Sequence, residues 1–123
     1  MPINASALKP KEKHVLSSCV ALLEVYKRLG ALDFFRVSTT GIPTKEGGFR
    51  KNSAAGFPDI LVWIQDGPEL YVEVKSRTGQ LSPLQKEFKR RAEAMGRIYV
   101  VIRSSGELSK LLERALRKKN PVS

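Results

Sequence analysis

The sequence has one cysteine, Cys19, and one histidine, His14, among its 123 residues. A lone cysteine cannot form an internal disulfide, and together these two residues are too few for a tetrahedral zinc cluster. The chain also lacks the apolar run of about 18 residues that a membrane-spanning helix needs. Its first residues, MPINASALKPKEKH, contain no apolar core of signal-peptide length. These absences predict an intracellular protein with no membrane partner, cytoplasmic in a bacterial or phage setting, and Cys19 as a small core residue.

Acidic residues are also scarce. Only 12 aspartates and glutamates stand against 22 lysines and arginines, which gives a net charge of +10. Such a balance favours a polyanionic partner, and nucleic acid is the commonest one. A content of 41% hydrophobic and 28% charged residues is typical of a folded chain. We therefore predict a single domain, 1–123, that folds and binds nucleic acid.

Apolar residues recur at helical or strand spacing in seven segments. Helices are predicted at 11–29, at 83–95 and onward from a cap at Ser105, and strands at 32–37, 60–64, 70–74 and 98–102. The turn Gln65-Asp66-Gly67-Pro68 predicts an antiparallel hairpin between the second and third strands. The helix between the third and fourth strands requires a parallel pair. The expected fold class is α/β, with a mixed α+β sheet and the order αβββαβα.

One long segment, 38–57, shows no regular hydrophobic pattern. It is rich in Gly, Ser and Thr and carries three basic residues, Lys45, Arg50 and Lys51. Loops of this length are usually functional. We predict a mobile basic loop.

Carboxylates gather in one part of this basic chain. Residues 52–74 include no lysine or arginine, and Lys75 directly follows Glu73-Val74. Side chains two apart on a strand leave the same face, so Glu73 and Lys75 point together. Asp59 begins the partner strand and shares that face only if paired residue numbers sum to an even value, as in a pairing of 61 with 73. We predict the even register, because an odd one would separate the two carboxylates unless a bulge intervened.

Two converging carboxylates make a hard oxygen site, which suits Mg²⁺ or Mn²⁺ rather than zinc. The backbone carbonyl of Val74 is a further candidate ligand. Such a site supports phosphodiester hydrolysis, because the metal polarises a phosphate oxygen and lowers the pKa of a bound water. Lys75 is predicted to hold the attacking water or the phosphate. We expect no small-molecule cofactor beside the metal ion.

These motifs resemble the PD-(D/E)XK nuclease superfamily, whose restriction-endonuclease-like core has the same order of elements. Pro58-Asp59 and Glu73-Val74-Lys75 match its two signature elements. Over about residues 11–103 the chain is further similar to the virus-type replication-repair nuclease family (VRR-NUC). The residues that carry this similarity are Gly56-Phe57-Pro58-Asp59, Glu73-Val74-Lys75, Gly79, Leu81-Ser82 and Gln85. The resemblance implies a metal-dependent nuclease with Asp59, Glu73, Lys75 and Gln85 at its catalytic site.

The family pattern also has an acidic residue on the first helix, and Glu12 and Glu24 are the candidates. Glu12 is in line with the apolar stripe of that helix and so points inward, whereas Glu24 lies about 120° away from it. We prefer Glu12 as a catalytic residue and metal ligand; the alternative is a first-turn acid that complements the helix dipole. Gln85 also has a second interpretation, as the partner of Ser82 in a capping box.

Basic residues are concentrated after residue 85. The residues predicted to contact the DNA backbone are basic residues of the loop 38–57, of the segment after the third strand and of the helix 83–95: Lys45, Arg50, Lys51, Arg77, Lys86, Lys89 and Arg90. Aromatic residues are sparse among them. We therefore expect no stacking surface for single strands, and duplex or branched DNA is the better partner.

The resemblance implies a finer function as well. Small single-domain members look like homodimeric resolvases that cut Holliday junctions in recombination and DNA repair, and two sites related by a two-fold axis suit such a junction. The prediction is a homodimeric, structure-selective endonuclease of this kind. Two alternatives stay open: a monomeric nicking or flap-type nuclease, and a catalytically inactive basic DNA-binding module on a nuclease scaffold.

Overall fold

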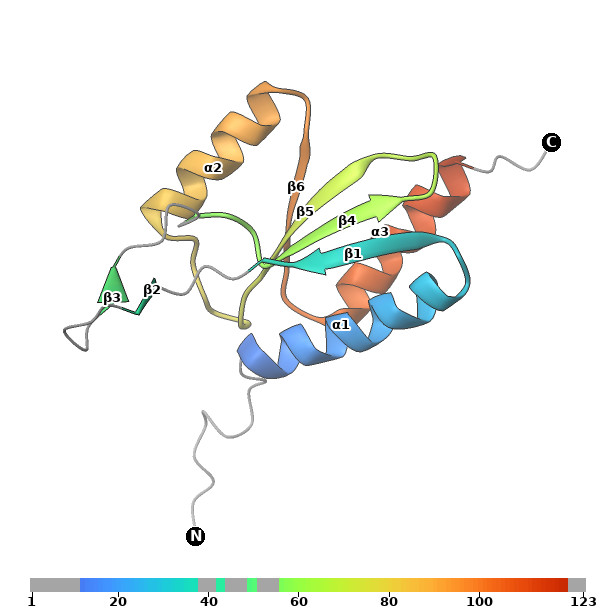
Figure 1. The fold of residues 1–123 in the computed structure, drawn as a ribbon, viewed down its shortest axis with the longest axis horizontal. Helices are drawn as coiled ribbons and strands as arrows, with labels where there is room; N and C mark the ends of the chain where they lie inside the picture. Colours follow the sequence, from blue (N-terminus) through green and yellow to red (C-terminus); the bar gives the residue numbers. More distant parts are fainter. Residues whose placement is uncertain (1–11, 38–41, 44–48, 51–55, 120–123) are drawn as a thin grey trace, which may run out of the picture.

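A computed structural model describes residues 12–37, 42–43, 49–50 and 56–119 of the chain. Its main elements follow the predicted order (Figure 1): α1 (Glu12–Arg28), β1 (Leu32–Arg36), β4 (Ile60–Ile64), β5 (Glu69–Val74), α2 (Pro83–Ala94), β6 (Ile98–Ile102) and α3 (Ser105–Lys119). The expected α/β class and the order αβββαβα are confirmed. No helix in the described ranges is long and apolar enough to cross a membrane.

The four long strands form one mixed sheet in the order β1-β4-β5-β6. β4 pairs antiparallel with both β1 and β5, while β5 and β6 run parallel and are joined through α2. In the β4–β5 hairpin Ile60 pairs with Val72 and Leu61 with Tyr71. Paired numbers therefore sum to an even value, which confirms the predicted register, although residue 61 pairs with 71 and not with 73.

The core lies between one face of this sheet and the helices α1 and α3, which pack against each other. Val62 and Val72 alternate inward from the sheet, Cys19 and Leu23 come from α1, and Leu112 comes from α3. Cys19 is fully buried there, as expected, and burial raises the pKa of its thiol to about 11. The other face of the sheet is left for the site.

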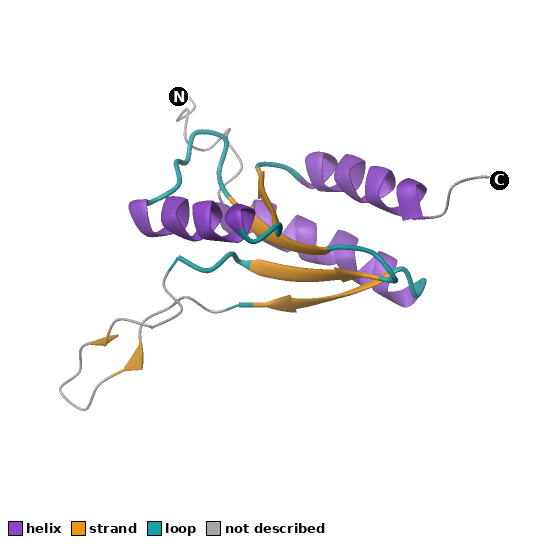
Figure 2. Cartoon of the chain, turned by 90° about the horizontal axis from the view of Figure 1, so that it is seen from above, coloured by secondary structure: helices purple, strands orange, loops and turns teal. Residues whose placement is uncertain are grey.

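On that other face, α2 packs over β6. Its Phe88 ring meets Tyr71 of β5 and Tyr99 of β6 with ring centroids 5.3 Å and 6.0 Å apart. α2 leaves the β1–β4 half uncovered, where Phe35 and Trp63 are 42% and 49% exposed. Figure 2, turned by 90°, shows the three helices and the strands from above.

Two sequence-based expectations need correction. The segment 38–57 was expected to be a loop without strands, but β2 (Ile42–Pro43) and β3 (Phe49–Arg50) form a short antiparallel pair that lies apart from the main sheet (Figures 1 and 2). The rest of that segment before Gly56, with Lys45 and Lys51, lies outside the described residues. The second correction concerns α3: Ser104, not Ser105, is the cap, because its Oγ accepts a hydrogen bond from the Glu107 backbone N–H at 3.2 Å.

Candidate active site

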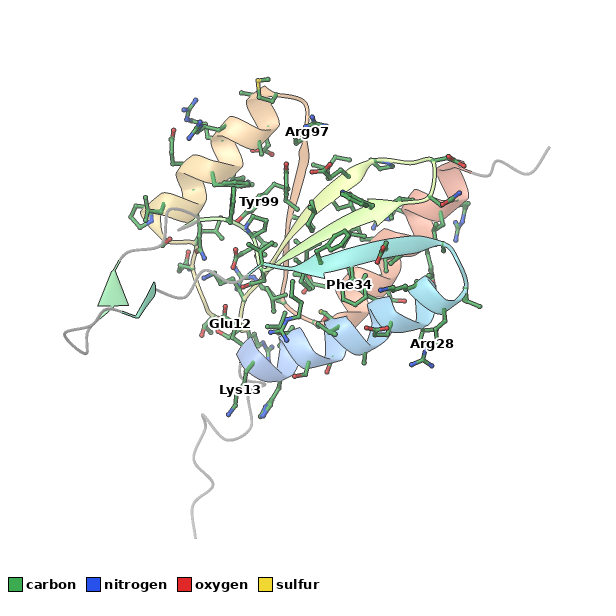
Figure 3. The ribbon with its side chains drawn as sticks, viewed as in Figure 1. Glu12, Lys13, Arg28, Phe34, Arg97 and Tyr99 are labelled. Carbon is green, nitrogen blue, oxygen red and sulfur yellow. The ribbon has the colours of Figure 1, made fainter. Side chains whose placement is uncertain are left out.

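Three carboxylates meet at one end of the sheet. Glu12 comes from the first turn of α1, Asp59 from the residue before β4, and Glu73 from β5. One oxygen of each lies within 4.8 Å of the others. Figure 3 labels Glu12 at the start of α1, beside the end of the sheet. Of the two candidates on this helix, Glu12 joins the cluster and Glu24 does not.

The hairpin explains why Asp59 and Glu73 face each other. Continuing the pairing of Ile60 with Val72 by one residue brings Asp59 opposite Glu73. The Val74 backbone N–H donates a hydrogen bond to Asp59 Oδ2 at 2.8 Å. Val37 N–H donates to the backbone carbonyl of Asp59 at 2.9 Å, so both neighbouring strands fix this residue. Asp59 is thus held in place by backbone groups on either side.

Glu73 is the buried member of the cluster, with 1% of its surface exposed. Burial raises its pKa to about 9, helped by a hydrogen bond with Asp59 and by the negative charges of Asp59 and Glu12, against the opposing effect of Lys75. The Tyr99 hydroxyl lies 3.5 Å from Glu73 Oε2, and burial followed by the Glu73 charge raises the pKa of Tyr99. A buried carboxyl with two carboxyl neighbours requires either a proton or a cation.

This oxygen set fits a hard divalent cation. Carboxylates are the protein ligands that Mg²⁺ prefers, and opposite ligands around it stand about 4.2 Å apart. The three oxygens lie within 4.8 Å of one another, so small side-chain adjustments would let them share one ion. Burial alone would keep Glu73 protonated near neutral pH, so a bound cation would replace that proton.

A family model for the VRR-NUC domain matches residues 46–106. The chain contains a VRR-NUC domain. This is a nuclease domain, and the matched residues include Asp59, Glu73 and Lys75, whereas Glu12 lies before them. No curated protein and no solved structure matches the chain.

Val74 is the last residue of β5, and Lys75 follows it at the edge of the VRR-NUC site. The Lys75 backbone N–H donates to the Ile102 carbonyl at 3.0 Å, which extends the parallel pairing with β6 past the last strand residue. Lys75 is half-buried, and its charge acts on the Glu73 carboxyl. Val74 is fully buried, with its N–H bound to Asp59. The lysine thus stands where it affects the charge of the cluster.

Gln85 takes part in the capping box predicted from the sequence. Its Oε1 accepts a hydrogen bond from the Ser82 backbone N–H at 2.8 Å, and its own backbone N–H donates to Ser82 Oγ at 3.2 Å.

Gly56, three residues before Asp59, lets α2 approach the Asp59 segment closely. A Cβ at Gly56 would come within 2.8 Å of the Leu84 carbonyl oxygen, and the φ of Gly56 is +93°. Close contact between the motif and the first turn of α2 therefore requires glycine.

The basic residues predicted to bind DNA differ in their exposure and in their ion pairs. Arg77 and Lys86 are exposed, and Lys89 lies 4.0 Å from Glu93 on the same helix. Arg90 donates to both oxygens of Glu87, at 2.9 Å and 2.6 Å, so its charge is largely balanced within α2. For Arg50 only the backbone, in β3, is described.

Sequence reasoning did not assign two residues that shape the VRR-NUC site. Tyr99 contacts Glu73, and Arg103 Nη1 donates to the carbonyls of Ser76 and Gly79, both at 2.7 Å. Arg103 thereby fixes the loop that follows Lys75. The one sequence signal for Arg103 is its place as a charged residue directly after the buried run Ile98–Ile102, since an arginine there needs acceptors.

Proposed function

We propose that this chain is a Mg²⁺- or Mn²⁺-dependent endodeoxyribonuclease, and in finer detail a homodimeric Holliday-junction resolvase-like enzyme. The observation that carries the proposal is the convergence of Glu12, Asp59 and Glu73, with Lys75 beside them, in a VRR-NUC domain. A nuclease that works on phosphodiesters through a metal needs this kind of oxygen cluster at an accessible edge of the fold.

Each residue of the site has a proposed role. Asp59 and Glu73, with Glu12 and the Val74 carbonyl, would hold the cation. When bound, the cation polarises a phosphate oxygen and lowers the pKa of a coordinated water. Lys75 holds the attacking water or the phosphate and balances the carboxylates. Gln85, at the start of α2, is proposed to contact the phosphate with its amide group.

Basic residues around the site support DNA as the substrate. Lys86 and Arg77 are exposed and make no ion pair within the described ranges. They are available for phosphate oxygens. Arg90 would first have to leave Glu87, whereas Lys89 is held less closely by Glu93. Lys45, Arg50 and Lys51 are proposed to add contacts from the segment before Gly56.

The homodimer is supported by the exposed aromatic pair Phe35 and Trp63. Their ring centroids lie 4.7 Å apart on the half of the sheet that α2 leaves uncovered. Aromatic side chains of this kind are enriched at interfaces between subunits. A two-fold axis at this surface would place two sites on one molecule of DNA.

The deciding experiment measures cleavage by the full chain of four-way junctions, flaps and linear duplexes, with Mg²⁺ and with EDTA. We expect Mg²⁺-dependent paired nicks across the junction, and a loss of about 100-fold or more in rate for Asp59→Asn, because the variant removes a ligand charge. Glu24→Gln, on the same helix as Glu12 but away from the cluster, is the control and should cut like the wild type.

The other outcomes separate the alternatives. Flap cutting by a monomer would replace the resolvase with a flap-type nuclease. Binding without cleavage under every metal condition would leave an inactive DNA-binding module. Equal cleavage by wild type and Asp59→Asn would remove the carboxylate cluster from the mechanism.

A further inference from the structure

An open groove of about 530 Å³ lies between α2 and the uncovered ends of β5 and β6. Three aromatic rings form much of its wall: Phe57, Tyr71 and Phe88. Phe88 makes edge contacts with the other two, with ring centroids 4.8 Å and 5.3 Å apart. Sparse aromatics in the basic part of the sequence predicted no stacking surface, but folding gathers these three rings from separate segments into one groove.

The groove opens on the same sheet face as the carboxylate cluster. Tyr71 and Glu73 are two apart on β5 and project to one side. Their separation along the strand is about 7 Å, which corresponds to about two stacked nucleotides of one DNA strand. Figure 3 shows Tyr99 beneath α2 and Arg97 just before the start of β6, away from Glu12.

Two exposed guanidinium groups, Arg91 and Arg97, belong to the same groove, and none of its lining residues is acidic. Burial and the neighbouring Glu69 raise the pKa of Tyr71, while Arg97 lowers it, so the Arg97 charge reaches the phenol. Neither arginine forms an ion pair within the described residues. The groove therefore combines apolar walls with positive charge that is not held in a short ion pair.

We propose that this groove receives one unpaired nucleobase of the substrate strand, with the phosphate beside that base bound by Arg91 or Arg97. Aromatic walls accept any base through its π-face, and arginine adds both charge and stacking. Groove volumes of a few hundred Å³ are typical for single small ligands. An apolar peptide would gain nothing from the two arginines, whereas a nucleotide uses both features.

This inference rests on the proposed nuclease function and specifies its substrate class. A base inside an intact duplex is stacked on both sides and cannot enter such a groove without being extruded, at a cost in free energy. The preferred DNA should therefore have an unpaired nucleotide one to three positions from the cut phosphate, as at a flap, a bulge or the opened centre of a junction. Perfect duplex should be the poorer substrate.

The test scans branched DNA with an abasic tetrahydrofuran nucleotide, placed at each position around the branch point in turn. Binding by the full chain is measured in EDTA, so that no strand is cut, and cleavage is measured separately with Mg²⁺. We expect one position to weaken binding roughly 5- to 100-fold, the range that loss of a single base stack produces. The other positions should change it little.

Phe57→Leu is the informative variant, because it keeps an apolar side chain at a position that is 42% exposed and removes the ring. It should weaken binding of intact DNA and abolish the penalty at the sensitive position. Arg91→Gln should also reduce that penalty. Arg28→Gln, which removes one exposed charge from the far end of α1, is the matched control and should leave the penalty unchanged.

The outcomes distinguish the proposal of a base-binding groove from the proposed nuclease function. A position-specific penalty that disappears in Phe57→Leu upholds the groove even if the chain never cuts DNA. Cleavage without any abasic position that changes binding more than about 2-fold overturns the groove and leaves the nuclease standing. A wild-type dimer that dissociates in Phe57→Leu, with no abasic effect, would make the groove a subunit interface and overturn the proposal as well.

Discussion

Glu73 is a carboxyl group surrounded by core residues, and its protonation links stability to pH. Its pKa in the unfolded chain is near 4.5 and rises to about 9 in the folded chain. Between these values the folded protein holds a proton that the unfolded chain has released. The contribution of this proton to the stability of the metal-free protein is therefore fully present below about pH 4.5 and is lost as the pH rises toward 9.

We predict that the free energy of unfolding in EDTA falls between pH 5 and 9, by up to about 1.4 kcal/mol per pH unit. Glu73→Gln, which cannot ionise, should remove most of this slope. Urea denaturation followed by circular dichroism at several pH values measures it. Glu24→Gln serves as the control and should keep the wild-type slope, and an unchanged slope in Glu73→Gln would show that another group is responsible.

Gly56 is a second position that affects stability, because the fold leaves no room for a Cβ atom there. We predict that Gly56→Ala lowers the free energy of unfolding by about 3 kcal/mol, because the new Cβ meets the Leu84 carbonyl in addition to the strain of a positive φ. Gly30→Ala is the matched control: its φ is +76° and a Cβ there meets nothing within 4 Å. It should cost about 1 kcal/mol. Thermal melts of the two variants that show equal losses would contradict the contact with α2.

At the scale of single residues, the sequence predicted those site residues that lie in short motifs, close in the chain to the groups they contact. Asp59, Glu73 and Lys75 follow from short patterns and from the two-residue period of a strand. Tyr99 and Arg103 did not follow, because their partners Glu73 and Ser76 are 26 and 27 residues away in the chain. Contacts of that separation depend on the register of β5 against β6, and the sequence predicted that these strands pair but not in which register.

At the scale of elements, Ser82 and Gln85 cap the start of α2, and Gln85 also has a proposed role in catalysis. Either Ser82→Ala or Gln85→Ala breaks the capping box and should cost about 1 kcal/mol. We predict that Gln85→Ala additionally lowers the cleavage rate about 10-fold or more, because its amide is proposed to contact the phosphate. Melts and initial cleavage rates of both variants test this. Equal cleavage rates of Ser82→Ala and Gln85→Ala would show that Gln85 acts only as part of the helix cap.

The elements themselves were predictable where local signals agree. Ser82, Pro83 and Gln85 mark the start of α2, and the turn at Asp66-Gly67 sets the hairpin. The short β2–β3 pair was missed because segments of two residues show no periodicity. The cap of α3 was placed one residue late because Ser104 and Ser105 are adjacent, and only backbone geometry distinguishes them.

At the scale of the whole molecule, the half of the sheet not covered by α2 is the surface that we propose for a second subunit. We predict that the chain sediments as a dimer and that Trp63→Lys raises the dimer dissociation constant roughly 30-fold, as loss of a central aromatic contact does. Analytical ultracentrifugation measures it against the chain mass of 13.7 kDa. The variant should then nick one strand of a junction at a time.

Leu29→Lys is the control for this change, since Leu29 is 75% exposed at the end of α1. It introduces the same charge at a residue outside the aromatic pair and should leave the dimer intact. A wild type that sediments as a monomer, or a Trp63→Lys variant that remains dimeric, would refute an interface at Phe35 and Trp63.

The carboxylate cluster joins residues far apart in the sequence, and this has a consequence for folding. The β4–β5 hairpin brings Asp59 and Glu73 together early, because it closes a short loop. Glu12 arrives only when α1 docks against β1 and α3, and α3 lies at the other end of the described sequence. Recovery of activity after dilution from denaturant should therefore lag behind recovery of helix. A partly folded chain already carries the positive charge that attracts nucleic acid, but it cannot yet cut it.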